Sequence, residues 1–480
     1  MRRGCIAVLA VAALCLAGCV VGPNYTRPAT PVPPAFRDAP PATAQEAASF
    51  ADLPWWEVFR DPVLQKLIRT ALEKNYDLRI AAEQITAARE QVIITHANQL
   101  PQISASGSYT GGQDAPLGTT GNTNLLALTA DVNYQIDFFG GLRRATEAAR
   151  AQLLATEEAR RTVIMTLVSD IATDYYQLLS LDLQLARAKE TIQSQAESVR
   201  LTRLRVEHGA ATQVDTLQAQ QVLDSANARI PELERQRTRY ENALSLLLGN
   251  YPEAIPRGAA LPEQYLAPEV PAGITSALLE RRPDIRQAEK MLIYYNAEIG
   301  VAKAALFPQI PLTGTAGASA ILTSTVASFP AVWTYGTSIT QSVFNGGALR
   351  SKVRVAESQQ RQALLVYAQT VQKAFGEVAD ALVDYRKYHD LRLREEQSVA
   401  TLNQALRLAL KRYRGGVTTY LEVLNDQLSL FAEQLTLAQA RGYEYQSVVA
   451  VYRSLGGGWK EEGPLVPPPS PQGPASASPQ

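Results

Sequence analysis

The longest pattern in the chain is a seven-residue spacing of apolar side chains between residues 141 and 208, a stretch without proline. A seven-residue repeat keeps one narrow face turned toward a neighbouring helix, so it predicts coiled-coil packing. At ~1.5 Å per residue the predicted helix is roughly 100 Å long, too long for a compact domain. A structural helix of a soluble coiled-coil protein would show the same pattern. The segments on either side of the helix must therefore decide whether the chain is such a protein. The members of the seam are Ile164, Ile171, Leu178, Leu185, Ile192, Val199 and Val206.

The hydrophobic period changes to two in the segments before this helix. Residues 128–138 alternate strictly between apolar and polar side chains, residues 102–110 alternate as well, and a polar loop from 111 to 124 joins them. Strict alternation predicts strands with one apolar and one polar face. Two such strands of about ten residues fit a hairpin of an outer-membrane barrel, although a hairpin of a soluble β-sandwich alternates equally well.

The chain contains an internal repeat. Asp77-Leu78-Arg79 recurs as Asp284-Ile285-Arg286, and the same shift, 284 − 77 = 207, relates Leu100-Pro101-Gln102-Ile103 to Phe307-Pro308-Gln309-Ile310. Each copy is predicted to contain a helix, a strand, a loop, a strand, a very long helix, a turn and another long helix. In the second copy, Trp333 and Tyr335 near one strand end are typical of the aromatic belt at a lipid interface.

The last helix of the second copy carries two apolar lines. Leu421 begins the first line, which favours a packing role for that residue. The first line continues through Leu428, Leu435 and Val449, and the second contains Leu424, Phe431, Tyr445 and Tyr452.

These patterns predict the domain organisation. A signal peptide (1–18) precedes a lipid-anchored N-terminal tether (19–60), repeat 1 (61–250), an equatorial crossing segment (251–273), repeat 2 (274–457) and a disordered tail (458–480). Repeat 1 is expected to contain a hairpin at about 101–138, a long helix over 141–208 and a helix over 212–248. Repeat 2 is expected to contain a hairpin at about 308–344, a long helix over 347–414 and a helix over 417–455.

Composition and the N-terminus narrow the class of protein. Lys+Arg and Asp+Glu are both 46, so no net field favours nucleic acid or acidic lipid. The three cysteines lie within the first nineteen residues, which excludes an internal disulfide or a cysteine metal site. Leu16-Ala17-Gly18-Cys19 follows a basic start and a short apolar run, and resembles a bacterial lipoprotein signal in which Cys19 is lipidated. Val20 after the cysteine then implies sorting to the outer membrane.

The predicted strands require association between copies of the chain. Four strands cannot close a barrel, and an open sheet edge is untenable in hydrocarbon. A barrel with an aqueous lumen needs more strands than one chain supplies. Three copies would give twelve strands and twelve helical segments, and both counts could close cylinders.

Several motifs, in this order, resemble those of the TolC-type outer-membrane efflux channels, in the lipid-anchored OprM/NodT-like branch. They cover nearly the whole mature chain. They imply a mixed α and β membrane protein: a homotrimer with a twelve-stranded transmembrane β-barrel, four strands per chain, continuous with a long periplasmic α-helical barrel. The motifs are CVVGPNYTRP (19–28), WW (55–56) with DPVL (61–64), RRPDIR (281–286), FPQI (307–310), YRGG (413–416) and LGGGW (455–459).

The resemblance also implies a function and partners. Such channels are the passive exit duct of tripartite pumps for drugs and other toxic compounds. Their partners are a periplasmic adaptor and an inner-membrane transporter of the RND type, besides outer-membrane lipid. No cofactor is implied apart from the covalent lipid on Cys19.

The family closes its channel at the periplasmic end, where the helix pairs converge. The resemblance therefore implies a gate at the two helix breaks around Gly209 and Gly416, and Gly209, Gly415 and Gly416 are also candidate adaptor contacts. In the family, a carboxylate six residues beyond the first tip glycine contacts a tyrosine and an arginine near the second tip. Asp215 and Tyr413 match the carboxylate and the tyrosine. Thr418 stands where the arginine is often found, so Arg412 or Arg414 could substitute.

The narrowest ring of the family matches Leu421, Glu422 and Asn425, with Glu422 supplying the main ring of negative charge. Without the family, Asp215 and Glu422 could be ordinary solvated helix residues. Gly209 and Gly416 could be helix C-caps, which is compatible with adaptor contact.

Three other functions were weighed against an efflux channel. An enzyme is disfavoured because the three histidines are far apart in sequence and no nucleophile, phosphate-loop or paired metal motif occurs. A purely structural periplasmic coiled-coil lipoprotein would need no amphipathic hairpins. The same fold could also serve type I protein secretion, although the motifs favour small-molecule efflux.

Overall fold

The computed structural model describes residues 20–34, 36, 53–112, 123–264, 277–322 and 330–457. The predicted signal peptide, Cys19 and the predicted tail 458–480 lie outside these ranges. The chain forms two compact units. Unit 1 holds residues 1–30, 82–159 and 284–370, and unit 2 holds 31–81, 160–283 and 371–480. Each unit therefore takes segments from both sequence repeats.

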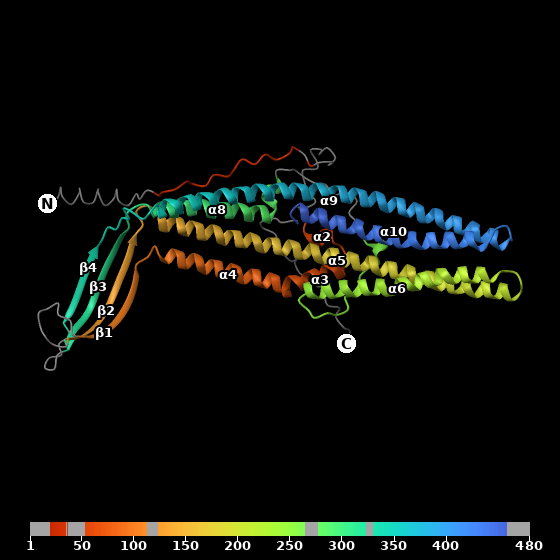
Figure 1. Ribbon diagram of the computed structural model, residues 1–480, viewed down its shortest axis with the longest axis horizontal. Helices are drawn as coiled ribbons and strands as arrows, with labels where there is room; N and C mark the ends of the chain where they lie inside the picture. The colour runs from red at the N-terminus through yellow and green to blue at the C-terminus, as the bar shows by residue number, and fades with distance from the viewer. Residues whose placement is uncertain are drawn as a thin grey trace, which may run out of the picture. The chain divides into compact units, whose positions relative to one another are not determined.

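The helices and strands recur at the spacing of the sequence repeat (Figure 1). The starts of α4 and α8 differ by 283 − 76 = 207 residues, and those of α6 and α10 by 420 − 213 = 207. In chain order the elements are α2 (Trp55–Val58), α3 (Pro62–Lys74), α4 (Tyr76–Ala97), β1 (Gln102–Gly112), β2 (Thr123–Ile136), α5 (Gly141–Glu207), α6 (Gln213–Leu247), η2 (Leu261–Glu263), α7 (Leu278–Arg281), α8 (Pro283–Ala304), β3 (Ile310–Leu322), β4 (Ala331–Thr337), α9 (Ala348–Arg414) and α10 (Tyr420–Ser454).

Unit 1 contains one antiparallel sheet in the order β1-β2-β3-β4 (Figure 1). The two predicted hairpins are joined side by side, because β2 pairs with β3 along its length. Directly opposed residues share a face, so one row contains Ile103, Val132, Gly314 and Tyr335. Within the described strands, β1 and β4 are the edges of this sheet.

The two faces of the sheet differ in polarity as the alternation predicted. Large apolar side chains of one face are exposed, among them Ile103, Leu128 and Trp333. The other face carries Asp131, which accepts hydrogen bonds from Ser106 (3.0 Å) and Thr315 (2.7 Å) on the neighbouring strands. The apolar face is therefore not part of the chain's own core.

The fourth strand is shorter than expected. Alternation predicted a hairpin to about residue 344, but β4 ends at Thr337, with only an isolated bridge between Gln309 and Thr340 beyond it. Val343 is 94% exposed. The register of β3 and β4 sets Pro311 opposite Ser338, and proline has no backbone N–H to donate to the ladder, so regular pairing ends there.

The predicted N-terminal tether needs correction at both ends. Residues 20–30 are extended but packed on unit 1: the Val21 N–H donates to the Phe139 carbonyl (3.0 Å), and Arg144 donates to the Asn24 side chain (2.7 Å). Gly22 has φ +106°, and a Cβ there would lie 2.6 Å from the Gly300 Cα. At the other end, α2 buries Trp55 within unit 2.

Unit 2 is built from the paired long helices and confirms the predicted seams. The seam residues Ile171, Leu178 and Leu185 of α5 are buried. Near the helix turns, a buried cluster takes members from all four helices: Val199 of α5, Val222 of α6, Ala409 of α9 and Val423 of α10. Along α10, the predicted line of Leu424, Phe431, Tyr445 and Tyr452 is buried.

Two further observations concern the helices. Leu421, expected to pack in the α10 seam, is 49% exposed. The start of α10 packs through Tyr420, Val423 and Leu424, and Leu421 lies on another side of the helix. The helix starts at Tyr420 rather than 417. None of the described helices has a stretch long and apolar enough to cross a bilayer.

Candidate functional site: the paired helix turns

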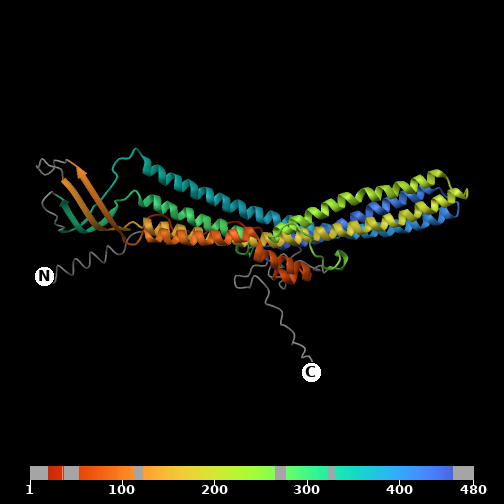
Figure 2. The ribbon, with the colours of Figure 1, turned by 90° about the horizontal axis from the view of Figure 1, so that it is seen from below.

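The candidate site lies where α5 turns into α6 and α9 turns into α10. Both views of unit 2 place these turns together at one end (Figures 1 and 2). Gly209 (φ +71°) and Gly416 (φ +69°) end the long helices in left-handed conformation. The residue after each glycine donates its backbone N–H back into the helix, at 2.7 and 3.0 Å. A Cβ at either glycine would meet nothing within 4 Å, so the backbone, and not crowding, requires glycine there.

The two short helices begin differently. Thr212 and Asp215 form a reciprocal capping box at the start of α6: the Asp215 N–H donates to the Thr212 hydroxyl (3.4 Å), and the Thr212 N–H donates to the Asp215 carboxylate (3.0 Å). The corresponding cap of α10, Thr419, makes no side-chain hydrogen bond. The two turns are thus chemically distinct.

Glu422, the repeat counterpart of Asp215, binds other side chains. Its carboxylate accepts from the Arg412 guanidinium (2.8 Å) and from the Thr418 hydroxyl (2.5 Å). All three groups are partly or fully exposed, so the ion pair contributes little to stability. Its consequence is electrostatic, because Arg412 offsets the negative charge of Glu422.

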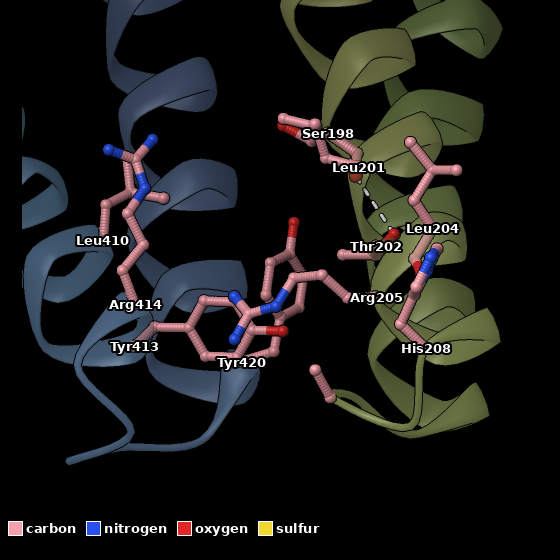
Figure 3. A pocket seen from close by; sticks show the side chains of 11 residues that line it. Ser198, Leu201, Thr202, Leu204, Arg205, His208, Leu410, Tyr413, Arg414 and Tyr420 are labelled. Atoms are coloured by element: carbon pink, nitrogen blue, oxygen red, sulfur yellow. Dashed lines mark hydrogen bonds between the residues drawn. The ribbon is translucent and has the colours of Figure 1, made fainter.

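Tyr413 connects the two turns (Figure 3). The Arg205 guanidinium of α5 lies 4.7 Å from the centroid of the Tyr413 ring, within cation–π range. The Tyr420 ring of α10 meets the Tyr413 ring edge-on, with centroids 5.2 Å apart and planes at 68°. Tyr413, on α9, therefore contacts side chains of both α5 and α10.

Asp215 and Tyr413 are neighbours, as predicted. Burial and the negative charge of the Asp215 carboxylate raise the pKa of Tyr413, and the positive charge of Arg205 opposes this rise. Burial also raises the pKa of Tyr420, to about 12. The Tyr413 hydroxyl is nonetheless buried without a hydrogen bond of standard geometry, so the coupling to Asp215 is through charge and proximity.

A cavity of about 520 Å³ lies beside Tyr413, between α5 and α9. Its wall mixes cationic, aromatic and apolar groups, and Figure 3 shows Arg205 extending from α5 toward Tyr413, while Arg414 lies along α9. The apolar side chains Leu201 and Leu204 of α5 are exposed. Val214 and Val417 in the turns are exposed as well. The turns thus leave apolar surface uncovered.

The structure brings together most of the predicted site residues. Asp215 lies beside Tyr413, and Thr418 beside Glu422, whereas Leu421 and Asn425 are exposed one and two turns into α10. Of the two arginines considered as substitutes, Arg412 pairs with Glu422 and Arg414 lines the cavity.

Sequence analysis did not predict two residues of the site, Arg205 and Tyr420, which both contact Tyr413. Arg205 lies next to Tyr413, where the resemblance implied an arginine. The one sequence signal for Arg205 was a basic residue in the last turn of α5. Cys19 lies outside the described residues. Within the described ranges, no three His, Cys, Asp or Glu side chains gather as a metal site.

The fold and the site define a class of protein. The described chain combines a sheet that has an exposed apolar face and unpaired edges with long helices that pack through a seven-residue apolar repeat. This combination is typical of a channel subunit of the outer membrane. The sequence matches the family described as "Outer membrane efflux protein" over residues 67–250 and 274–457. The chain belongs to this family.

Individual relatives agree. The chain is 34% identical over 452 residues to the Cation efflux system protein CusC of Escherichia coli O157:H7, covering 94% of this chain and 98% of CusC. It is 36% identical over 465 residues to the Toluene efflux pump outer membrane protein TtgC of Pseudomonas putida, covering 95% and 96%. The solved outer-membrane channel OprN superimposes with a TM-score of 0.83 at 31% identity, covering 92% and 99%.

These findings confirm the predictions of family, fold class, efflux function and outer-membrane location. The chain is an outer-membrane efflux protein with the fold of the outer-membrane channels. Among the described residues, the fold includes the internal repeat and one sheet of four strands.

Proposed function

We propose that the protein is the passive exit duct of a tripartite efflux system and that it works as a homotrimer. The sheet of unit 1 carries this proposal. Its apolar face is exposed, and its edge strands β1 and β4 have no outer partner in the described chain. In hydrocarbon every backbone N–H and C=O needs a partner, so the edges must pair with other copies. Three copies supply twelve strands, which is enough to enclose an aqueous lumen.

The proposed partners are a periplasmic adaptor and an inner-membrane transporter of the RND type. A duct without an energy source needs a pump, and the names of CusC and TtgC describe those proteins as parts of efflux systems. The proposed cargo is small toxic compounds, of which cations and toluene are the examples that these two names give. No catalytic residue and no cofactor is proposed, apart from a lipid on Cys19 after removal of residues 1–18.

The proposed gate is the pair of helix turns. Asp215 and Tyr413 hold α6 and α9 together, with Arg205 in place of an arginine at Thr418. Leu421, Glu422 and Asn425 on α10 form the constriction, and the exposure of Leu421 and Asn425 in the single chain supports this role. Gly209, Gly415 and Gly416 with the exposed apolar side chains of the turns are the proposed adaptor contact.

The experiment that tests the function has two parts. Purified protein in detergent should have the mass of a trimer by light scattering and should form ion-conducting channels in planar bilayers. Expressed in a cell that lacks its own outer-membrane efflux channel, together with a periplasmic adaptor and an RND-type transporter, it should restore resistance to dyes. A monomer stable in water without detergent would favour the structural coiled-coil lipoprotein instead. Restored secretion of a protein substrate without dye resistance would favour type I secretion.

Charge selectivity tests the constriction. Glu422→Gln should reduce the preference for cations, because each carboxylate about 10 Å from an ion in water contributes about 0.4 kcal/mol, roughly twofold per charge. Arg412→Gln is the matched opposite change: it removes the cation that offsets Glu422 and should raise the preference. Reversal potentials under a KCl gradient measure both. Equal reversal potentials for the wild-type protein and both variants would mean that the charge-selective ring lies elsewhere.

A further inference from the structure

The cavity beside Tyr413 has the size and the position of a ligand site. Its volume is about 520 Å³, within the range of roughly 300–1,000 Å³ that small-molecule sites occupy. Its lining comes mainly from α5, from the end of α9 and from the start of α10 (Figure 3). One bound molecule in this cavity would therefore contact helices of both repeats.

Part of the lining is apolar and aromatic. Leu201 and Leu204 of α5 and Leu410 of α9 contribute aliphatic side chains, and the rings of Tyr413 and Tyr420 complete this part. Leu201 and Leu204 are 45% and 39% exposed, so a ligand that covers them removes apolar surface from water, which is favourable. Aliphatic and aromatic groups together favour a ligand with a flat apolar body.

The ionisable side chains of the lining, apart from the tyrosines, are basic. Arg205 and Arg414 line the cavity, and neither guanidinium forms an ion pair with a described residue. His208 adds a third basic side chain, and none of the described residues that line the cavity is acidic. A guanidinium binds carboxylate and phosphate oxygens through paired N–H donors. Two guanidiniums without a carboxylate partner therefore favour an anionic ligand.

The internal repeat shows why Arg205 lacks a carboxylate partner. Its counterpart in the second repeat is Arg412 (205 + 207 = 412), which pairs with Glu422 at 2.8 Å. The counterpart of Glu422 is Asp215, whose carboxylate instead accepts a backbone N–H in the capping box of α6. Of the two equivalent arginines, the one that lines the cavity is therefore the one whose charge no described carboxylate offsets.

We propose that this cavity is a binding site for a small organic anion with a flat apolar body. The guanidiniums of Arg205 and Arg414 bind the anionic group, and the leucines and tyrosine rings contact the apolar body. Because the ligand contacts α5 and α9 at once, it stabilises the arrangement of the helix turns seen in this structure. Its effect on the channel rests on the proposed gate, whereas binding itself does not.

Isothermal titration of the detergent-solubilised protein tests binding. The probe is 2-naphthalenesulfonate, and 2-naphthylmethylammonium is the matched cation with the same ring system. The sulfonate should bind at one site per chain, at least about tenfold more tightly than the ammonium, because the guanidiniums attract the anion and repel the cation. Equal affinities would mean that the ring system adsorbs to apolar surface without regard to charge, and would overturn the proposal.

Three variants locate the site. Arg414→Gln should weaken sulfonate binding about tenfold, because it removes a charge-assisted hydrogen bond. Arg412→Gln is the matched control: it removes the same charge two residues away, from a side chain that does not line the cavity, and should leave the affinity near that of wild type. Ser198→Phe keeps every charge and fills the cavity from α5, so it should abolish binding while the mass and helix content stay those of wild type. Equal weakening by the two arginine variants, or binding that survives Ser198→Phe, would overturn the site. If Ser198→Phe does not fold, the two arginine variants decide alone.

Single-channel recording tests the consequence for the gate. At a concentration near the wild-type Kd, 2-naphthalenesulfonate should lower the open fraction of the wild-type channel much more than that of Arg414→Gln. Unchanged wild-type currents at a concentration that titration shows to be saturating would overturn the link to the gate and leave the binding site. Failure of the protein to form channels at all would overturn the proposed function and not the binding site.

Discussion

Asp215→Ala should raise the single-channel conductance of the protein in planar bilayers. The change removes the carboxylate beside Tyr413 and half of the capping box with Thr212. A lost contact of about 1–2 kcal/mol shifts the ratio of open to closed tips by roughly tenfold. Tyr413→Phe should act in the same direction, because it removes the hydroxyl that faces Asp215 without changing the ring contacts with Arg205 and Tyr420.

Two controls separate the gate from helix stability. Thr212→Ala breaks the capping box but leaves Asp215 next to Tyr413, so it should cost about 1 kcal/mol of helix stability and leave the conductance near wild type. Asp215→Asn keeps a capping acceptor and loses the charge, so its conductance should rise. The double variant of Asp215→Ala and Tyr413→Phe should be less than additive, because both changes remove the same contact. Unchanged conductance in both single variants would remove the gate assignment.

Leu128→Arg should abolish the accumulation of trimer in the outer membrane. Leu128 is exposed in the middle of the apolar face, opposite Gly107 and Ala318. A charged side chain facing lipid near the bilayer midplane costs about 2–4 kcal/mol per chain, and three chains carry the change in a trimer. Fractionation of membranes on a density gradient, followed by native electrophoresis, measures the loss.

The adjacent residue provides the matched control. Ala127 lies on the opposite face, in the row of Ser108 and Ser319, so Ala127→Arg should point to water and leave the trimer intact. The two substitutions introduce the same side chain one position apart. Loss of trimer with Ala127→Arg but not with Leu128→Arg would mean that the assignment of the lipid and lumen faces is reversed.

The periodic features could be read from the sequence because they are local properties of the backbone. A seven-residue spacing and a two-residue spacing each select one geometry, and Ile171 and Leu178 are buried in the coiled coil as that spacing requires. Gly209 and Gly416 marked the helix ends because left-handed backbone favours glycine. The family motifs then placed Asp215 and Tyr413 at the turns, where the structure brings them together.

The features that sequence reading missed depend on contacts between distant segments. Composition predicted an extended tether after Cys19, but it could not show that Gly22 approaches Gly300 closely enough to fix residues 20–30 on unit 1. Arg205 and Tyr413 lie on the two long helices, and their stacking is set by how those helices pack. The pattern of α10 likewise could not show that Leu421 lies outside the packed seam.

The sequence by itself therefore determined the two periodicities, the repeat, the helix ends and the amphipathic strands, since each is encoded in residues that are neighbours along the chain. Only the tertiary structure decided that β2 pairs with β3, that Arg205 covers Tyr413, and that Arg412 neutralises Glu422. Those contacts depend on which apolar faces pack together. Because the hydrophobic effect is non-directional, a pattern of apolar residues shows that a face is buried but not which other face it packs against.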